Sequence, residues 1–187
     1  MPGYDSSRLT GDRTMLDVRL NALKRAMQLE KEGMAYYQAS RDKATSEIGR
    51  NMFEYLRKSE EGHIRRIREI YHTLEQSGVW PEHPPVAEET GDAYKTIFTN
   101  ALAELDEKQH LDADDIAALE QAAEFERKGE NFYAERAEAV TDLFEKNFYT
   151  QLAHEEFHHL KAIQDSILML KDPQGFFADR EFGTLAG

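Results

Sequence analysis

The chain has 187 residues, of which 40% are hydrophobic and 32% charged, which suits one soluble domain with a single hydrophobic core. Its formal net charge of −13 disfavours nucleic acid and membrane surfaces as partners. There is no cysteine, which excludes disulfides, thiolate zinc sites and iron–sulfur centres. The sequence also has no signal-peptide core and no apolar run of ~20 residues, so we expect a cytoplasmic protein.

The first half of the chain predicts two long helices. Residues 1–13 are rich in Gly, Ser and Asp and predict a loose N-terminal segment. Apolar side chains then recur at helical spacing over about 14–40 and again over about 45–76. Only a short polar turn separates the two segments, so the helices should be antiparallel neighbours.

The second half predicts another pair of helices after a long connection. Residues 78–112 contain three prolines near their start, which predicts a crossover with a minor helix at about 92–105. Helical periodicity returns over about 112–140 and 142–171. The tail, 172–187, carries three Phe and should pack on the bundle. We therefore predict an all-α four-helix bundle over 14–171 with a long crossover between its second and third helices.

Two segments of the chain resemble each other. LEKEGMAYY at 29–37 and FERKGENFY at 125–133 place Glu, Gly and Tyr at the same offsets, 96 residues apart. The aligned acids are Glu30 and Glu126, and Glu30 interrupts an apolar stripe where an aliphatic residue would be expected. The repeat indicates two internally similar helix pairs.

A Glu-x-x-His motif also occurs in both halves. Glu60 and His63 form the first copy, and Glu155 and His158 form the second, at a shift of 95 residues. Residues three apart lie on one face of a helix. Each motif therefore directs a carboxylate and an imidazole to the same place.

These acidic seam positions need a counter-charge. Four carboxylates facing one another in a bundle core would repel, and each unpaired buried charge costs several kcal/mol. Two divalent cations would resolve this, and the oxygen and nitrogen ligands suit iron or manganese, with zinc also possible. A metal-free bundle that binds a partner is the alternative. The predicted metal ligands are Glu30, Glu60, His63, Glu126, Glu155 and His158.

Several neighbouring residues are candidates for supporting roles. Tyr37 and Tyr133 each follow the ligand Glu of their helix by two turns, so their hydroxyls either hydrogen-bond ligand carboxylates or simply pack in the core. Glu130 could act as a mobile ligand or proton carrier, or could be solvated. His154 and His159 flank the second motif and are interpreted as surface or outer residues.

The chain resembles the rubrerythrin branch of the ferritin-like superfamily over about residues 15–171. The resemblance implies a ferritin-like bundle with two iron ions, acting in hydrogen peroxide reduction or in ferrous iron oxidation by peroxide or oxygen. An external donor protein would supply electrons, because a cysteine-free chain lacks the family's rubredoxin module. Non-enzymatic iron binding or storage is the alternative, and dimers are common, so we expect a homodimer. The motifs that carry the resemblance are Glu30-x-x-Gly33, Glu60-x-x-His63, Glu126-x-x-Gly129, Glu155-x-x-His158 and the DPQGFF tail at 172–177.

Overall fold

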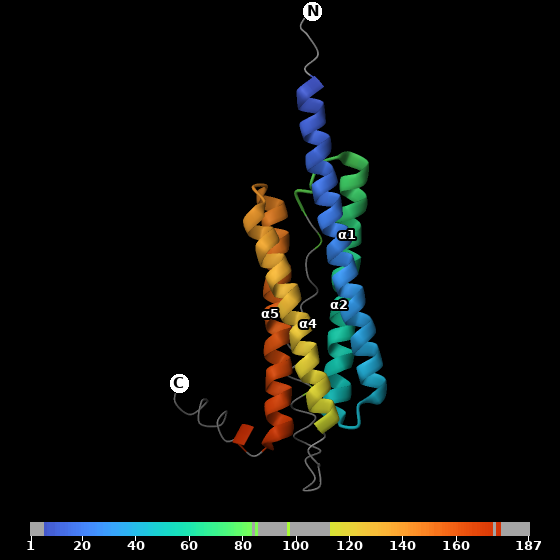
Figure 1. Cartoon of the computed structure of the whole chain (residues 1–187), viewed down its shortest axis with the longest axis vertical. Helices are drawn as coiled ribbons and strands as arrows, with labels where there is room; N and C mark the ends of the chain where they lie inside the picture. Colours follow the sequence, from blue (N-terminus) through green and yellow to red (C-terminus); the bar gives the residue numbers. More distant parts are fainter. Residues whose placement is uncertain (1–5, 84, 86–96, 98–112, 174, 177–187) are drawn as a thin grey trace, which may run out of the picture.

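Four long helices make up the part of the chain that the structure describes. The computed structural model describes residues 6–83, 85, 97, 113–173 and 175–176 (Figure 1). Within these residues there is no strand, which confirms the prediction of an all-α four-helix bundle. The helices are α1 (Ser6–Lys43), α2 (Glu47–Ser77), α4 (Ala113–Ala139) and α5 (Leu143–Lys171).

The helix directions require a long crossover. α1 runs antiparallel to α2, and α4 runs antiparallel to α5, whereas α2 and α4 run in the same direction (Figure 1). The end of α2 and the start of α4 therefore lie at opposite ends of the bundle (Figure 1). Among the described residues between α2 and α4, Trp80 and Ile97 are buried in the core. The minor helix predicted at 92–105 falls outside the described residues, apart from Ile97.

Helix boundaries follow from local capping. Ser46 accepts a hydrogen bond from the backbone N–H of Gly49 and so begins α2, and Asp142 caps α5 in the same way. Gly78 ends α2 in the left-handed conformation with φ 72°, which a residue without a Cβ adopts easily. Its N–H bonds to the carbonyl of Leu74.

The N-terminal boundary differs from the sequence-based expectation. Residues 6–13, expected as part of a loose segment, belong to α1, which projects past the end of the bundle (Figure 1). This stretch contains no proline, and its one glycine costs a helix only about 1 kcal/mol. The other three helices begin and end within two residues of the prediction.

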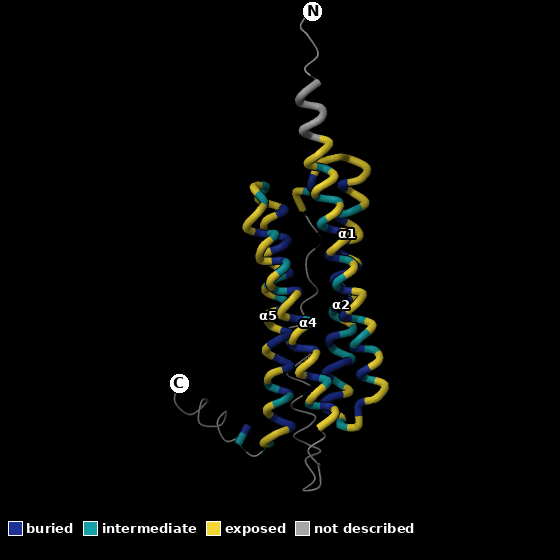
Figure 2. The backbone as a smooth tube through the Cα atoms, in the orientation of Figure 1, coloured by how far each residue is buried: buried dark blue, intermediate teal, exposed yellow. Residues whose placement is uncertain are grey.

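The core is divided into two apolar clusters along the bundle axis. α1 packs mainly against α2 and α4 mainly against α5, and the buried faces point inward (Figure 2). One cluster gathers Leu23, Ile67 and Phe148. The other gathers Phe53, Leu119 and Ile163. The acidic seam positions lie between these two clusters.

The ends of the chain add two observations. Phe176, at the start of the tail, is buried in the cluster of Phe53 and Met169. The rest of the predicted tail contact, from 177 to 187, lies outside the described residues. None of the described helices is long and apolar enough to cross a membrane.

Candidate metal centre

Six ionisable side chains are buried between the two apolar clusters. α1 and α4 each supply one carboxylate, whereas α2 and α5 each supply a carboxylate and an imidazole. None of the six side chains is more than 4% exposed. The residues are Glu30, Glu60, His63, Glu126, Glu156 and His159.

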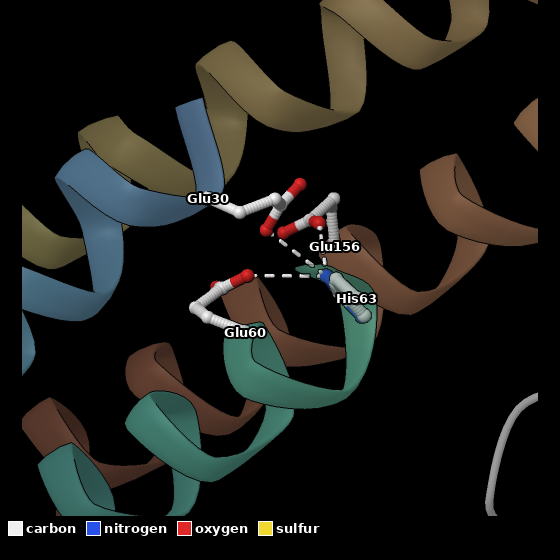
Figure 3. Close-up of side chains that lie close together, drawn as sticks. All are labelled: Glu30, Glu60, His63 and Glu156. Atoms are coloured by element: carbon white, nitrogen blue, oxygen red, sulfur yellow. Dashed lines mark hydrogen bonds and ion pairs between the residues drawn. The ribbon is translucent and has the colours of Figure 1, made fainter. Parts of the chain in front are cut away.

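The first group of potential ligands surrounds His63. Its Nδ1 atom lies 3.1 Å from a carboxylate oxygen of Glu30, of Glu60 and of Glu156. Figure 3 shows these three carboxylates converging on the imidazole from α1, α2 and α5. One ligand atom from each of the four residues lies within 4.8 Å of all the others, so the group could hold a metal ion.

A second group overlaps the first. Nδ1 of His159 lies 3.2 Å from Oε2 of Glu126 and 3.6 Å from Oε2 of Glu156. These residues and Glu60 again place their ligand atoms within 4.8 Å of one another. Glu60 and Glu156 belong to both groups, so two adjacent cation positions would share these two carboxylates.

The shared carboxylates have oxygen atoms that no protein donor satisfies. Oε2 of Glu60 and Oε1 of Glu156 are buried without a hydrogen bond, although each lies 3.1 Å from Nδ1 of His63. Of the three carboxylates around that nitrogen, only Glu30 meets it with hydrogen-bond geometry. Leaving a buried charged acceptor unpaired is costly. A cation between the groups would satisfy both oxygens, and this sulfur-free donor set fits iron or manganese.

Without a cation, protons must balance the negative charge. Burial raises the pKa of Glu126 to about 8, and the negative charge of Glu156 adds to this effect. Burial opposes protonation of His159, but the carboxylates of Glu126 and Glu156 outweigh it and raise its pKa to about 10. The pKa of His63 is also raised well above its usual value, because nearby carboxylates outweigh the effect of burial.

The second Glu-x-x-His assignment needs correction by one residue. The structure brings Glu30, Glu60, His63 and Glu126 together as expected, but the predicted ligands Glu155 and His158 lie outside both groups. Their places are taken by the next residues along α5, which are Glu156 and His159. His159 is thus a cluster residue, not the surface or outer residue expected from the sequence.

The physical reason is the rotation of α5. Each residue turns a helix by 100°, and the buried face includes Leu152 and Ile163, which places 156 and 159 inward. His158 is exposed, and its Nε2 lies 3.2 Å from Nε2 of His154. The segment EEFHH contains two overlapping Glu-x-x-His motifs, so spacing alone did not separate them. The 96-residue repeat selects the second motif, because 60 and 63 then align with 156 and 159.

Two tyrosines hydrogen-bond carboxylates of the cluster across the bundle. The hydroxyl of Tyr37 on α1 donates to Oε1 of Glu126 on α4 at 2.5 Å. The hydroxyl of Tyr133 on α4 donates to Glu30 on α1. Burial and the nearby carboxylates raise the pKa of both hydroxyls well above the usual value, so both keep their protons. Glu130, the third candidate for a supporting role, is half-buried and outside both groups.

The outward nitrogens of the two histidines also have partners. Nε2 of His63 lies 2.9 Å from Oε2 of Glu155, and this carboxylate accepts two hydrogen bonds from Arg66. Nε2 of His159 lies 2.8 Å from Oγ of Ser59. A proton held on Nε2 leaves the Nδ1 lone pair free to face the carboxylates, as metal coordination requires.

A cavity reaches the cluster from between α1 and α4. It has a volume of about 160 Å³. The carboxylates of Glu30, Glu60 and Glu126 line it together with Gly33 and Gly129. A Cβ atom at Gly129 would lie only 3.2 Å from Cδ of Glu156, so the missing side chain makes room for that carboxylate.

Comparisons with known proteins give no relative. The chain matches no protein-family model, no curated protein and no solved structure. The capacity of the cluster to hold metal therefore follows from its own geometry. That geometry is compatible with a di-iron site.

Proposed function

We propose that this chain is a ferritin-like di-iron oxidoreductase of the rubrerythrin type, which reduces hydrogen peroxide with electrons from an external donor protein. The supporting observation is the pair of overlapping ligand groups, in which Glu60 and Glu156 are shared and each has an unsatisfied oxygen. A Glu on each of two helices and Glu-x-x-His on each of the other two is the ligand pattern of di-iron bundle proteins.

The residues of the chain would hold the iron, admit the substrate, exclude bulk water and carry protons. Bound iron would supply two electrons, which together with two protons convert hydrogen peroxide to two molecules of water. The cavity of about 160 Å³ admits a molecule with few heavy atoms and leads directly to the carboxylates. The apolar clusters on both sides of the centre keep bulk water away.

Proton handling falls to the tyrosine–carboxylate pairs. Tyr37 lines the cavity and holds its hydroxyl proton against Oε1 of Glu126. Tyr133 holds the equivalent proton against Glu30. Acid–base catalysis needs a proton-bearing group within hydrogen-bond reach of the substrate, and Tyr37 meets this condition for a molecule in the cavity. The role of Glu130 as a further proton carrier remains a prediction.

The test is an anaerobic ferrous titration of the metal-free full-length chain. We expect saturation at two ions per chain, followed by consumption of hydrogen peroxide when an electron donor is supplied. Binding of one ion or none would contradict the dinuclear assignment. Uptake of iron far beyond two ions per chain would instead indicate a storage protein. Repeating the reaction with oxygen in place of peroxide, and comparing the two rates of iron oxidation, would show which oxidant is preferred.

A further inference from the structure

The inner ligand sets of the two positions are alike. Each consists of three carboxylates and one imidazole that faces them through Nδ1. The pairs Glu60 and Glu156, and His63 and His159, lie 96 residues apart in the internal repeat. The types of ligand residue are therefore the same at the two metal positions.

The outer partners are also related by the repeat, but they differ chemically. Ser59 and Glu155 each precede the Glu of their motif and lie 96 residues apart. Each reaches across the bundle to the histidine of the opposite motif. His159 therefore meets a neutral hydroxyl, whereas His63 meets a carboxylate.

Arg66 strengthens this difference. Both of its terminal nitrogens bond the carboxylate of Glu155, and the arginine itself is only 5% exposed. The same carboxylate lies 2.9 Å from Nε2 of His63, so Arg66 and His63 hold it between them. The residue that corresponds to Arg66 in the second half is Ala162, which cannot hold Ser59 in place.

We propose that the two metal positions are inequivalent, and that Glu155 is the positioning residue that makes the position beside His63 the tighter one. This inference rests on the proposed binding of two metal ions. A carboxylate that accepts the Nε2–H hydrogen bond makes the imidazole a stronger electron-pair donor to a metal ion through Nδ1. The hydrogen bonds from Arg66 fix the orientation of that carboxylate. Loss of such an outer partner typically weakens metal affinity by about 10–100-fold, so the His63 position should fill first.

The experiment is an anaerobic titration of the full chain with cobalt(II), followed by visible absorption. The wild-type chain should bind two ions in separate steps, with dissociation constants that differ by about 10–100-fold. Ser59 and Ala162 occupy the positions of the repeat that correspond to Glu155 and Arg66. The double variant Glu155→Ser with Arg66→Ala therefore gives His63 the same outer partners as His159. This variant should weaken binding of the first ion by about 10–100-fold, so that the two dissociation constants become nearly equal.

A matched variant assigns the weaker step. Ser59→Ala removes the outer partner of His159 and should affect only the second ion. Two equal steps in the wild-type chain, or a double variant that weakens both steps equally, would overturn the inference while leaving a dinuclear site intact. Binding of fewer than two ions would overturn both the proposed function and the inference. Melting of each metal-free variant shows whether it has folded.

Discussion

The hydroxyl of Tyr37 on α1 donates a 2.5 Å hydrogen bond to a carboxylate oxygen of Glu126, 89 residues further along the chain on α4. Replacing Tyr37 by Phe would leave that buried oxygen with one donor fewer. We expect the free energy of unfolding of the metal-free protein to fall by about 1–3 kcal/mol, measured by urea denaturation.

The neighbouring residue provides the control. The hydroxyl of Tyr36 also links α1 to α4, but it donates 2.8 Å to the backbone carbonyl of Ala118, away from the cluster. Tyr36→Phe should leave metal affinity unchanged, whereas Tyr37→Phe should weaken it. Equal effects of both substitutions on metal affinity would show that Tyr37 acts only in packing.

The register of α5 can be tested with paired substitutions. Glu156→Gln removes a carboxylate that both ligand groups share, so we expect fewer than two ferrous ions per chain. Glu155→Gln removes only the outer partner of His63 and should retain two ions at lower affinity. His159→Gln removes a residue of one ligand group and should also lower the number of ions bound, whereas His158→Gln should leave that number at two. If His158→Gln lost a metal ion and His159→Gln did not, the assignment would be wrong.

The two glycines that correspond in the repeat should respond differently to alanine. A Cβ atom at Gly33 would meet its nearest neighbour, Cε2 of Tyr37, at an ordinary 3.5 Å. Gly33→Ala should therefore gain up to about 1 kcal/mol of stability from helix propensity. At Gly129 the Cβ atom would press on the side chain of Glu156 at 3.2–3.4 Å. Gly129→Ala should show little or no such gain and should weaken metal binding, as measured by thermal melting and ferrous titration.

The pH dependence of the metal-free protein follows from the raised pKa values. Glu126, at about 8, and His159, at about 10, hold their protons more tightly in the folded state than in the unfolded chain. The stability that these protons provide is complete below the ordinary pKa of each group, and is lost as pH rises through the raised values. The melting temperature should therefore fall between about pH 4.5, the ordinary pKa of a Glu side chain, and about pH 10.

Metal affinity should change in the opposite direction over the same range. Ligands must lose their protons to bind a cation, so binding should release protons and strengthen with rising pH. Calorimetric titration in buffers of different ionisation enthalpy measures the release directly. Glu126→Gln, which cannot titrate, should flatten the fall in melting temperature; an unchanged fall would assign it to other groups.

The sequence predicts most of this fold and only part of the candidate site. Helical periodicity located all four helices, and the prolines after Trp80 indicated the crossover. The choice between Glu155 and Glu156 failed because both lie within helical spacing of Leu152 and both precede a His by three residues. Alignment of the repeat at one constant shift would have found the inward residue. The contact between Nε2 of His63 and the carboxylate of Glu155 could not be foreseen, because it depends on how two helices that are distant in sequence face each other.

The antiparallel helix pairs suggest how such a centre could have originated. α1 and α2 supply a Glu and a Glu-x-x-His, and α4 and α5 supply the same set at a constant offset of 96 residues. Two identical copies of one helical hairpin, paired about a twofold axis, would thus contain the complete ligand set. Such a homodimer could not present a serine to one histidine and a glutamate to the other. Joining the hairpins in one chain permits that asymmetry, because the two halves are then free to diverge.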